Sequence, residues 1–306
     1  MDSSAESSSV VGGRRGDLIE RLRRSPVLGD GAMGSMLMSG GGKWTVPEEL
    51  NFEAPERVRA VHAAYVAAGS ELVVTNSFGG SPAKLALVGL EAKAVECNRL
   101  AASLAREAAG EGVWVGGSIG PTGRFLEPLG DLTLAEAEAG FALQATALEA
   151  GGADLIVVET MSSLEEAAAA VRAAKHSCGL PVVCTMTFEA TGRPGEFRTM
   201  MGVSVEQLLE LVTLGADAIG VNCGQGPAAM LEVVQQIRAL DSGVPLIAQP
   251  NAGAPRLEAG KAVYDVSPAV LGEFAARARD LGVALIGACC GSSPAHIQAM
   301  AEVLRS

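Results

Sequence analysis

Short β-branched segments alternate with Ala- and Leu-rich segments about eight times along the 306 residues of the chain. This is the order of parallel strands joined by crossover helices, and eight such units favour a closed barrel, which needs about 250 residues. The expected strands are Val27–Leu28, Glu71–Thr75, Val113–Ser118, Leu155–Glu159, Val182–Thr187, Ala218–Asn222, Leu246–Gln249 and Leu285–Gly287. We therefore predict an α/β fold, a (β/α)8 TIM barrel, as one domain over residues 17–306.

Glycine residues mark the ends of the helices that precede four of these strands. They lie in the segments AAGSEL, AGGADL, TLGADA and DLGVAL. Glycine often follows the last turn of a helix because it reaches left-handed backbone angles without strain. Ser267–Pro268 and Ser293–Pro294 have the pattern of an N-cap residue followed by a first-turn proline, so we expect them to begin the last two helices.

The charge balance excludes several classes of partner. The chain has 23 basic and 35 acidic residues and a formal charge of −12, with no basic stretch that would bind nucleic acid or an anionic membrane. No segment reaches the run of about 18 apolar residues that a membrane span requires. Residues 1–16 are Ser-rich and lack the apolar run of a signal peptide. We expect a disordered N-terminal tail and a cytoplasmic protein.

The six cysteines, without a secretory signal, are expected to be free thiols or metal ligands. Cys223 follows the sixth expected strand, and the adjacent Cys289 and Cys290 follow the eighth. A barrel would bring these three thiols to its C-terminal end. A lone cysteine is more often a small buried apolar residue, and we interpret the other three in that way. They are Cys97, Cys178 and Cys184.

Three converging thiolates match the ligand number of a catalytic zinc site, which leaves its fourth position to water or substrate. Three thiolates and Zn²⁺ carry a net charge of −1, so the ion is a poor activator of water and a good holder of an electron-rich thiolate. The expected chemistry is alkylation of a substrate sulfur at a site with one Zn²⁺ per chain. A metal-free barrel lyase or isomerase would leave the thiols without a role.

Polar side chains at other strand ends are candidates for substrate binding. Glu159 ends the apolar run DLIVV, where a carboxylate needs a cation or hydrogen-bond donors, so it is well placed for a substrate ammonium group. Asp30 either shares that role or binds neighbouring backbone amides. Thr75 and Asn76 either hold an amino-acid substrate or simply end their strand.

The segment Gly29–Gly34 has the GxGxxG spacing of a dinucleotide-binding turn. The next expected strand, however, comes about 40 residues later and ends without the acidic residue that would bind a ribose. We interpret the segment instead as a glycine turn that exposes backbone N–H groups to a substrate carboxylate.

Nine short motifs lie in order between about Val27 and Leu304. They are GDGAMGS, ELNFEAPE, TNSFGG, GSIGPTG, ETMSS, MTFEATGR, GVNCGQGP, QPNAG and GACCGSSPAHI. Together they resemble the homocysteine S-methyltransferase family. The resemblance is closest to the homocysteine-binding domain of cobalamin-dependent methionine synthase and to bacterial betaine–homocysteine methyltransferase-like proteins.

The resemblance implies a (β/α)8 barrel that forms L-methionine by methyl transfer to a zinc-bound homocysteine thiolate. The implied site residues are zinc ligands, contacts of the substrate amino group and contacts of the substrate carboxylate. In that order they are Cys223, Cys289 and Cys290; Asp30 and Glu159; and Gly31, Thr75 and Asn76.

The methyl donor is constrained less. A quaternary ammonium donor such as betaine favours an aromatic cage, for which Trp44 and Phe78 are candidates unless they are ordinary loop or core residues. Gly79 stands where betaine-using members of the family resemble one another in carrying tyrosine. We therefore expect a methyl-corrinoid (methylcobalamin) on a separate protein, with betaine or S-methylmethionine as alternatives. A function of a different class is a non-catalytic zinc-binding subunit that docks a corrinoid protein.

Overall fold

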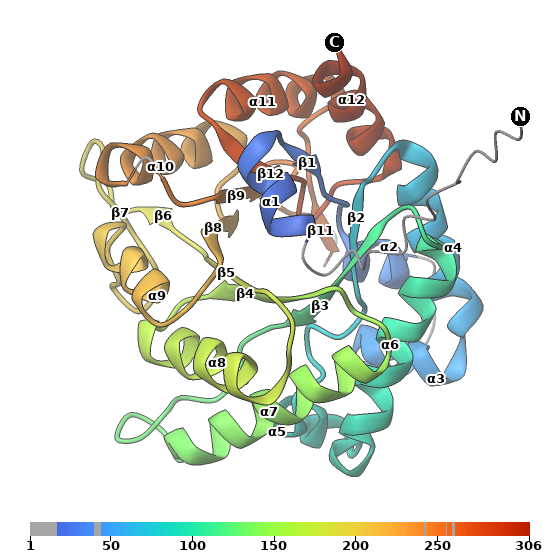
Figure 1. Ribbon diagram of the computed structural model, residues 1–306. Coiled ribbons are helices and arrows are strands. Elements are labelled where there is room, and N and C mark those ends of the chain that lie inside the picture. The colour runs from blue at the N-terminus through green and yellow to red at the C-terminus, as the bar shows by residue number, and fades with distance from the viewer. Residues whose placement is uncertain (1–16, 40–43, 242, 255, 259–260) are drawn as a thin grey trace, which may run out of the picture.

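A ring of eight parallel strands forms the centre of the computed structural model (Figure 1). The structure describes residues 17–39, 44–241, 243–254, 256–258 and 261–306. Within these ranges the barrel strands are β1 (Val27–Leu28), β2 (Leu72–Val74), β3 (Trp114–Ile119), β4 (Leu155–Met161), β5 (Val182–Met186), β8 (Ala218–Cys223), β9 (Leu246–Pro250) and β12 (Val283–Ile286). They follow one another around the ring in chain order, which confirms the predicted TIM barrel.

The ring closes where its first strand meets its last and its second. Val27 of β1 lies opposite Leu285 of β12 in a parallel pair. On the other side of β1, the Glu71 N–H donates to the Leu28 carbonyl at 2.8 Å. All eight expected strands form, and their ends lie within two residues of the prediction, as where β12 begins at Val283 rather than Leu285.

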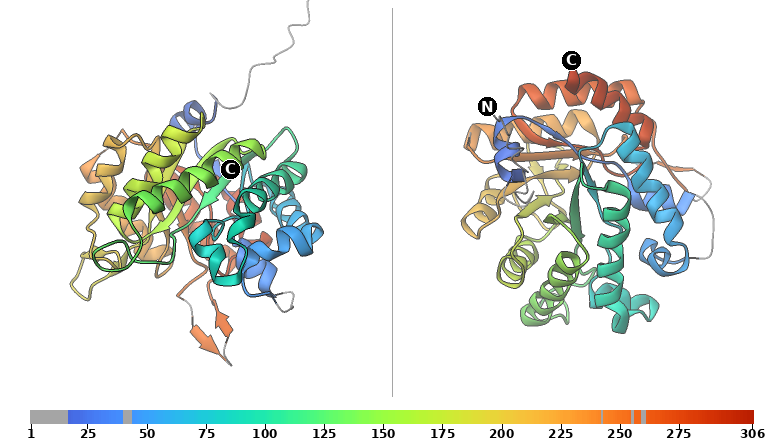
Figure 2. Two further views of the ribbon diagram at one scale, coloured as in Figure 1. Left: turned by 90° about the horizontal axis from the view of Figure 1, so that it is seen from below. Right: turned by 45° about the vertical axis from the view of Figure 1, so that its right-hand side comes forward.

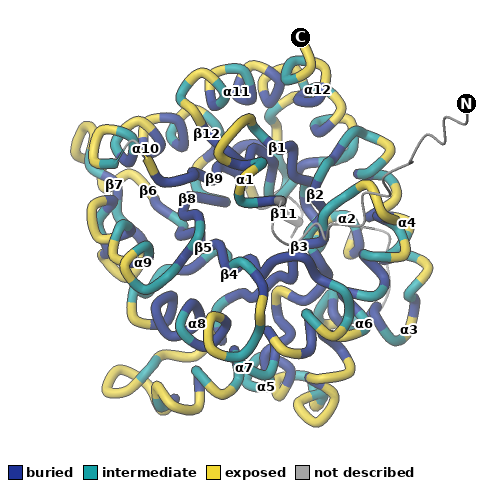
Figure 3. Tube along the Cα trace, viewed as in Figure 1, coloured by how far each residue is buried: buried dark blue, intermediate teal, exposed yellow. Residues whose placement is uncertain are grey.

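Helices cover the outer face of the barrel and turn their buried sides toward it (Figure 3). The longer ones are α4 (Pro55–Ala68), α6 (Ala94–Ala109), α7 (Leu134–Ala150), α8 (Leu164–Ser177), α10 (Pro227–Leu240), α11 (Pro268–Asp280) and α12 (Pro294–Arg305). The shorter ones are α2 (Met33–Ser39), α3 (Leu50–Glu53), α5 (Pro82–Leu85) and α9 (Glu210–Thr213). The prolines predicted to begin the last two helices do so. The four predicted helix-ending segments each contain a glycine at positive φ, namely Gly69, Gly152, Gly215 and Gly282.

Aliphatic side chains fill the interior of the barrel, and helix α1 (Asp17–Arg24) lies across its N-terminal end (Figure 1). Leu18 and Leu22 of α1 are buried against strand residues. Those residues are Val27, Leu72, Leu155, Val157, Val183, Ala218, Ile247, Ala284 and Leu285. Because this end is packed, a substrate site has to lie at the C-terminal end, where barrel enzymes build theirs.

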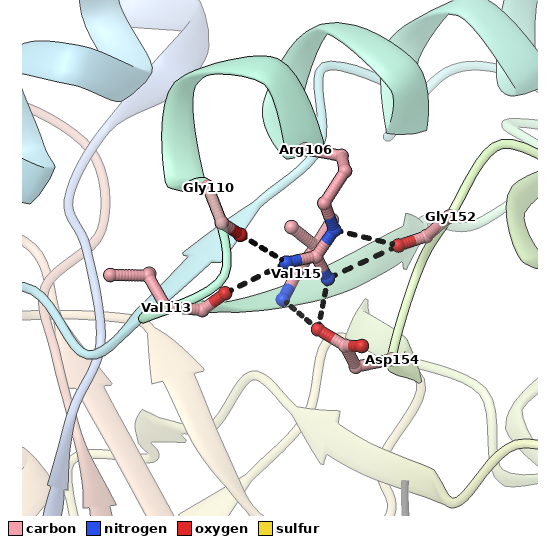
Figure 4. Close-up of polar contacts among 6 residues, drawn as sticks. All are labelled: Arg106, Gly110, Val113, Val115, Gly152 and Asp154. Atoms are coloured by element: carbon pink, nitrogen blue, oxygen red, sulfur yellow. Dashed lines mark hydrogen bonds and ion pairs between the residues drawn. The ribbon is translucent and has the colours of Figure 1, made fainter. Parts of the chain in front are cut away.

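The same N-terminal end carries an ion pair joined to the backbone (Figure 4). The guanidinium of Arg106, near the end of α6, binds the carboxylate of Asp154, which precedes β4. Asp154 also accepts the N–H of Val115 in β3 at 2.8 Å. The remaining Arg106 donors bind carbonyl oxygens of neighbouring turns, those of Gly110, Val113 and Gly152.

This arrangement recurs at alternate strands. In each copy an acidic residue just before one strand accepts an N–H from the preceding strand and pairs with a basic residue of the helix before that. The other two copies are Glu71 with Leu28 and Arg21, and Asp217 with Val182 and Lys175. These three acid–base pairs tie neighbouring strands together at the N-terminal end of the barrel, the end that in this fold contributes to stability and not to catalysis.

Two small hairpins lie in the connections after β5 and β9. They are β6 (Glu189–Ala190) with β7 (Phe197–Arg198), and β10 (Arg256–Glu258) with β11 (Lys261–Val263). The second extends away from the barrel in the left view of Figure 2. None of the helices in the described ranges has the length and hydropathy of a membrane span. The predicted N-terminal tail, residues 1–16, lies outside the described residues.

Candidate active site

A cavity of about 430 Å³ lies at the C-terminal end of the barrel. All of the predicted site residues except Trp44 line it: Asp30, Gly31, Thr75, Asn76, Phe78, Glu159, Cys223, Cys289 and Cys290. Glu159 and Cys223 lie in the C-terminal parts of β4 and β8, and the others lie in the connections after β1, β2 and β12, because the carboxyl ends of parallel strands meet at one end of a barrel.

Three thiols gather at one point of this lining. The Cys223 and Cys289 sulfurs are 2.8 Å apart, the Cys289 and Cys290 sulfurs are 4.0 Å apart, and all three lie within 4.8 Å of one another. The cysteines are free, since a disulfide would hold its sulfurs about 2.05 Å apart. Hydrogen bonds from the other two thiols lower the pKa of Cys290 to about 3. The cluster therefore favours an anionic sulfur.

The cluster fits a zinc ion. Tetrahedral zinc with bonds to sulfur of about 2.3 Å holds its sulfurs about 3.8 Å apart, so the Cys289–Cys290 separation is close to that value and the Cys223–Cys289 separation is about 1 Å shorter. Asn251 lies beside the cluster: its amide nitrogen donates to the Gly224 carbonyl, and the N–H of the next residue donates to the Cys290 carbonyl. Its buried Oδ1 has no hydrogen-bond partner among the described residues, as expected near a cation site.

The backbone beside the cluster is in an uncommon conformation. Thr160 and Cys223 have φ values of 62° and 58°, in the left-handed region that residues with a Cβ rarely adopt. The side chain of Asn222 holds this geometry by bonding the Thr160 N–H and hydroxyl and the Thr185 hydroxyl. Strain of this kind persists where surrounding contacts fix it, and it is common at active sites.

Two carboxylates flank the thiols: Asp30 is buried, and Glu159 is partly exposed to the cavity. Burial raises the pKa of Glu159 to about 7, although the Ser118 hydroxyl donates to one carboxylate oxygen and Asn222 to the other. Burial also raises the pKa of Asp30, whose Oδ2 accepts the Val74 N–H at 2.8 Å. The negative charge of Glu159 raises it further. Neither acid has a cation partner among the described residues, so the cavity is suited to a cationic ligand group.

The side chains of Thr75 and Asn76 are already engaged. Ser77 donates its proton to the Ser118 carbonyl, so Thr75, 2.6 Å from the Ser77 hydroxyl, is the donor between the two. The Asn76 amide nitrogen donates to the Pro47 carbonyl and to Asn51. The Thr75 N–H donates to the Gly116 carbonyl at 2.9 Å, so in the described structure the Asn76 N–H is the donor of this pair that remains for a ligand carboxylate.

The two aromatic residues predicted on the donor side differ in position. Phe78 lines the cavity, where its ring lies so close to Gly120 that a Cβ there would be 2.5 Å from the ring. Trp44 does not line it: its indole N–H donates to Glu53 and the guanidinium of Arg57 lies over its ring, 4.6 Å from the centroid. The two rings do not form a cage around one ligand.

Comparison with known proteins agrees with this geometry. Residues 27–304 match the model of the family described as homocysteine S-methyltransferase. The chain belongs to this family. Methionine synthases of Mycobacterium tuberculosis (strain ATCC 25618 / H37Rv) and Mycobacterium leprae (strain TN) are each 33% identical to it, over 311 and 308 residues. Each match covers 94% of this chain and 25% of the relative, so the homocysteine S-methyltransferase chain spans about a quarter of these curated relatives.

Solved structures give the same result. The homocysteine methyltransferase MmuM from Escherichia coli in its oxidized form superposes with a TM-score of 0.73 at 26% identity, covering 92% of this chain and 96% of that one. The metallated form superposes with a TM-score of 0.74 at 24% identity, covering 93% and 97%. Family, fold and cavity together identify a methyltransferase enzyme.

One residue of this S-methyltransferase site escaped the sequence interpretation. Tyr264 follows β11 and packs on the cysteine segment so closely that a Cβ on Gly291 would be 2.1 Å from its ring. Its hydroxyl interacts with Cys290, and burial with the charge of that cysteine raises the pKa of Tyr264 to about 12. No sequence signal marks Tyr264, because it comes from a hairpin connection that barrel periodicity does not predict.

Proposed function

We propose that this enzyme forms methionine by methylating the sulfur of homocysteine at a zinc ion held by Cys223, Cys289 and Cys290. The observation that carries the proposal is the group of three free thiols within 4.8 Å in a cavity that the carboxylates of Asp30 and Glu159 also line. Zinc at this position would stabilise the substrate sulfur as a thiolate near neutral pH.

Different residues of the cavity then bind the different groups of the substrate. Glu159, fixed by Ser118 and Asn222, accepts the ammonium group, and Asp30 adds negative charge beside it. The substrate carboxylate lies at the turn of Gly31 and at the Asn76 N–H, with Thr75 beside it in the cavity wall. These contacts hold the substrate sulfur at the cysteines, where it attacks the methyl carbon. A carbon–sulfur bond forms, and the leaving group departs with the electron pair of the broken bond.

A methylated corrinoid on a separate protein is the proposed donor. A quaternary ammonium donor needs aromatic faces around its cationic head. Here Phe78 lines the described cavity, and Gly79 beside it has no side chain. Trp44 lies outside the lining and contacts Arg57 and Glu53 instead. Betaine and the sulfonium donor S-methylmethionine are the alternatives. The different-class alternative, a docking subunit without catalysis, is disfavoured by membership of an enzyme family.

The test is methionine formation from homocysteine with methylcobalamin, betaine and S-methylmethionine at matched concentrations, with zinc measured in the same samples. We expect one zinc per chain and the highest rate with methylcobalamin. The paired change of Cys289 and Cys290 to Ala removes both zinc and activity, whereas Cys178→Ala, away from the cavity, changes neither. Robust turnover with betaine beside negligible turnover with the corrinoid refutes the donor assignment, and activity without zinc refutes the metal assignment.

A further inference from the structure

Ser292 joins the turn after β1 to the segment that carries two of the cysteines. Its buried hydroxyl accepts the Ala32 N–H at 3.0 Å and donates to the Cys289 carbonyl at 2.7 Å. The Ala288 N–H donates to the Asp30 carbonyl at 3.0 Å just before the cysteines. The hydrogen bonds between Ala32 and Ser292 and between Ala288 and Asp30 thus join two segments that lie about 260 positions apart in the chain.

Tyr65 of α4 supports this contact from behind. Its hydroxyl donates to the Ala32 carbonyl at 2.9 Å, and it also lies 3.5 Å from the Ser292 carbonyl oxygen. The ring is completely buried. A Cβ placed on Gly31 would be 2.5 Å from the Ser292 hydroxyl oxygen and 2.9 Å from the Tyr65 hydroxyl oxygen, so both residues pack closely against the turn and leave no room for a side chain at position 31.

We propose that Ser292 is a positioning residue that sets the separation between the amino-acid-binding turn and the cysteine cluster, so that homocysteine binds at both ends at once. This inference rests on the proposed function, in which the substrate carboxylate lies at the turn and its sulfur at the cysteines. Ser292 itself is not among the residues that line the cavity.

The physical basis is the gain from binding two ends of one ligand. Once the sulfur is held, the amino-acid end meets its site at a high effective concentration, provided that the distance between the two sites matches the ligand. A misplacement of about 1 Å can cost about 100-fold in reaction rate where groups must be aligned, which shows how steeply a two-ended fit depends on distance. Loss of the Ser292 bridge should therefore weaken a ligand that uses both ends and spare a ligand that uses one.

The experiment compares two ligands of the zinc-loaded protein by calorimetry: homocysteine, and 2-mercaptoethanol, which offers a thiol without an amino-acid group. For Ser292→Ala we expect full zinc content, a loss of homocysteine affinity of about tenfold or more, and an unchanged affinity for 2-mercaptoethanol. Ser292→Thr keeps the hydroxyl and should restore homocysteine affinity. Ser70→Ala is the matched control, because this buried serine donates to the Gly29 carbonyl on the same segment and makes no hydrogen bond to the cysteines in the described structure.

The outcomes separate the inference from the proposed function. Unchanged homocysteine affinity in Ser292→Ala overturns the inference, and so does an equal loss of affinity for both ligands, which would make Ser292 part of the metal site alone. If the unmodified protein binds zinc without binding homocysteine, or binds no zinc, the proposed function fails before the variant is considered.

Discussion

Changing Glu159 to Gln is expected to stabilise the homocysteine-free protein while weakening substrate binding. Burial raises the pKa of Glu159 from 4.5 to about 7. The unfolded chain therefore releases this proton at lower pH than the folded protein does. In consequence, stability is lost as the pH rises from about 4.5 to about 7 and stays low above that. The glutamine side chain of the variant carries no charge, so the variant should not show this loss.

The size of the stability difference follows from the shift in the pKa of Glu159. Two and a half pKa units correspond to about 3.4 kcal/mol at about 1.36 kcal/mol per unit. The Glu159 side chain is open to the cavity, where water screens part of its charge, so we expect a gain of about 1–3 kcal/mol in the variant at pH 8. Near pH 4.5 the two proteins should be equally stable, since the carboxyl is then largely protonated in the folded state.

Urea denaturation of both zinc-loaded proteins at pH 5 and pH 8 measures this difference, and calorimetry measures homocysteine affinity. We expect affinity to fall by about 2–4 kcal/mol because a desolvated partner of the ammonium group is lost. Glu166→Gln is the control, because Glu166 is a buried carboxylate that binds Thr122 and does not line the cavity. A variant less stable than the parent at pH 8 would refute the reasoning.

Three further outcomes are expected. The paired change of Cys289 and Cys290 to Ser should lower bound zinc from one per chain to none by elemental analysis. Burial lowers the pKa of His62 to about 4, so the free energy of unfolding should fall by about 3 kcal/mol as the pH drops from about 6.5 to 4. Urea denaturation of His62→Leu should not show this loss. Arg106→Leu should cost about 2–4 kcal/mol of stability, with homocysteine affinity unchanged in calorimetry.

The barrel and most of its site follow from the sequence because both depend on local order along the chain. Alternation of strands and helices fixes the sequence of elements, and parallel strands must bring their carboxyl ends together. Cys223 and Cys289 meet for this reason, although 66 positions separate them. The ends of the strands, the helix-ending glycines and the first-turn prolines were predicted by the same local rules.

The remaining features depend on contacts that local rules do not contain. Ser292 and Tyr65 are ordinary residues of a helix-opening segment and a helix, and their role appears when Ala32 is placed between them. Cys223 has a positive φ, which its residue type does not predict. Trp44 was predicted on the donor side from its place in the sequence, but its side chain contacts Arg57 and Glu53 outside the cavity lining.

Acidic residues at the two ends of the barrel differ in whether they have a cation partner, and this difference predicts how many protons are released when homocysteine binds. At the N-terminal end Asp154 pairs with Arg106, whereas Glu159 in the cavity has no cation partner among the described residues. At pH 7 a carboxyl with a pKa of about 7 is half protonated, so an arriving ammonium group should displace about half a proton from Glu159. The substrate thiol, with a free pKa of about 8.5, should release about one more when held as thiolate. Calorimetry in buffers of different ionisation enthalpy should therefore count about 1.5 protons for the parent and about 1.0 for Glu159→Gln. Equal counts would show that Glu159 does not meet the ammonium group.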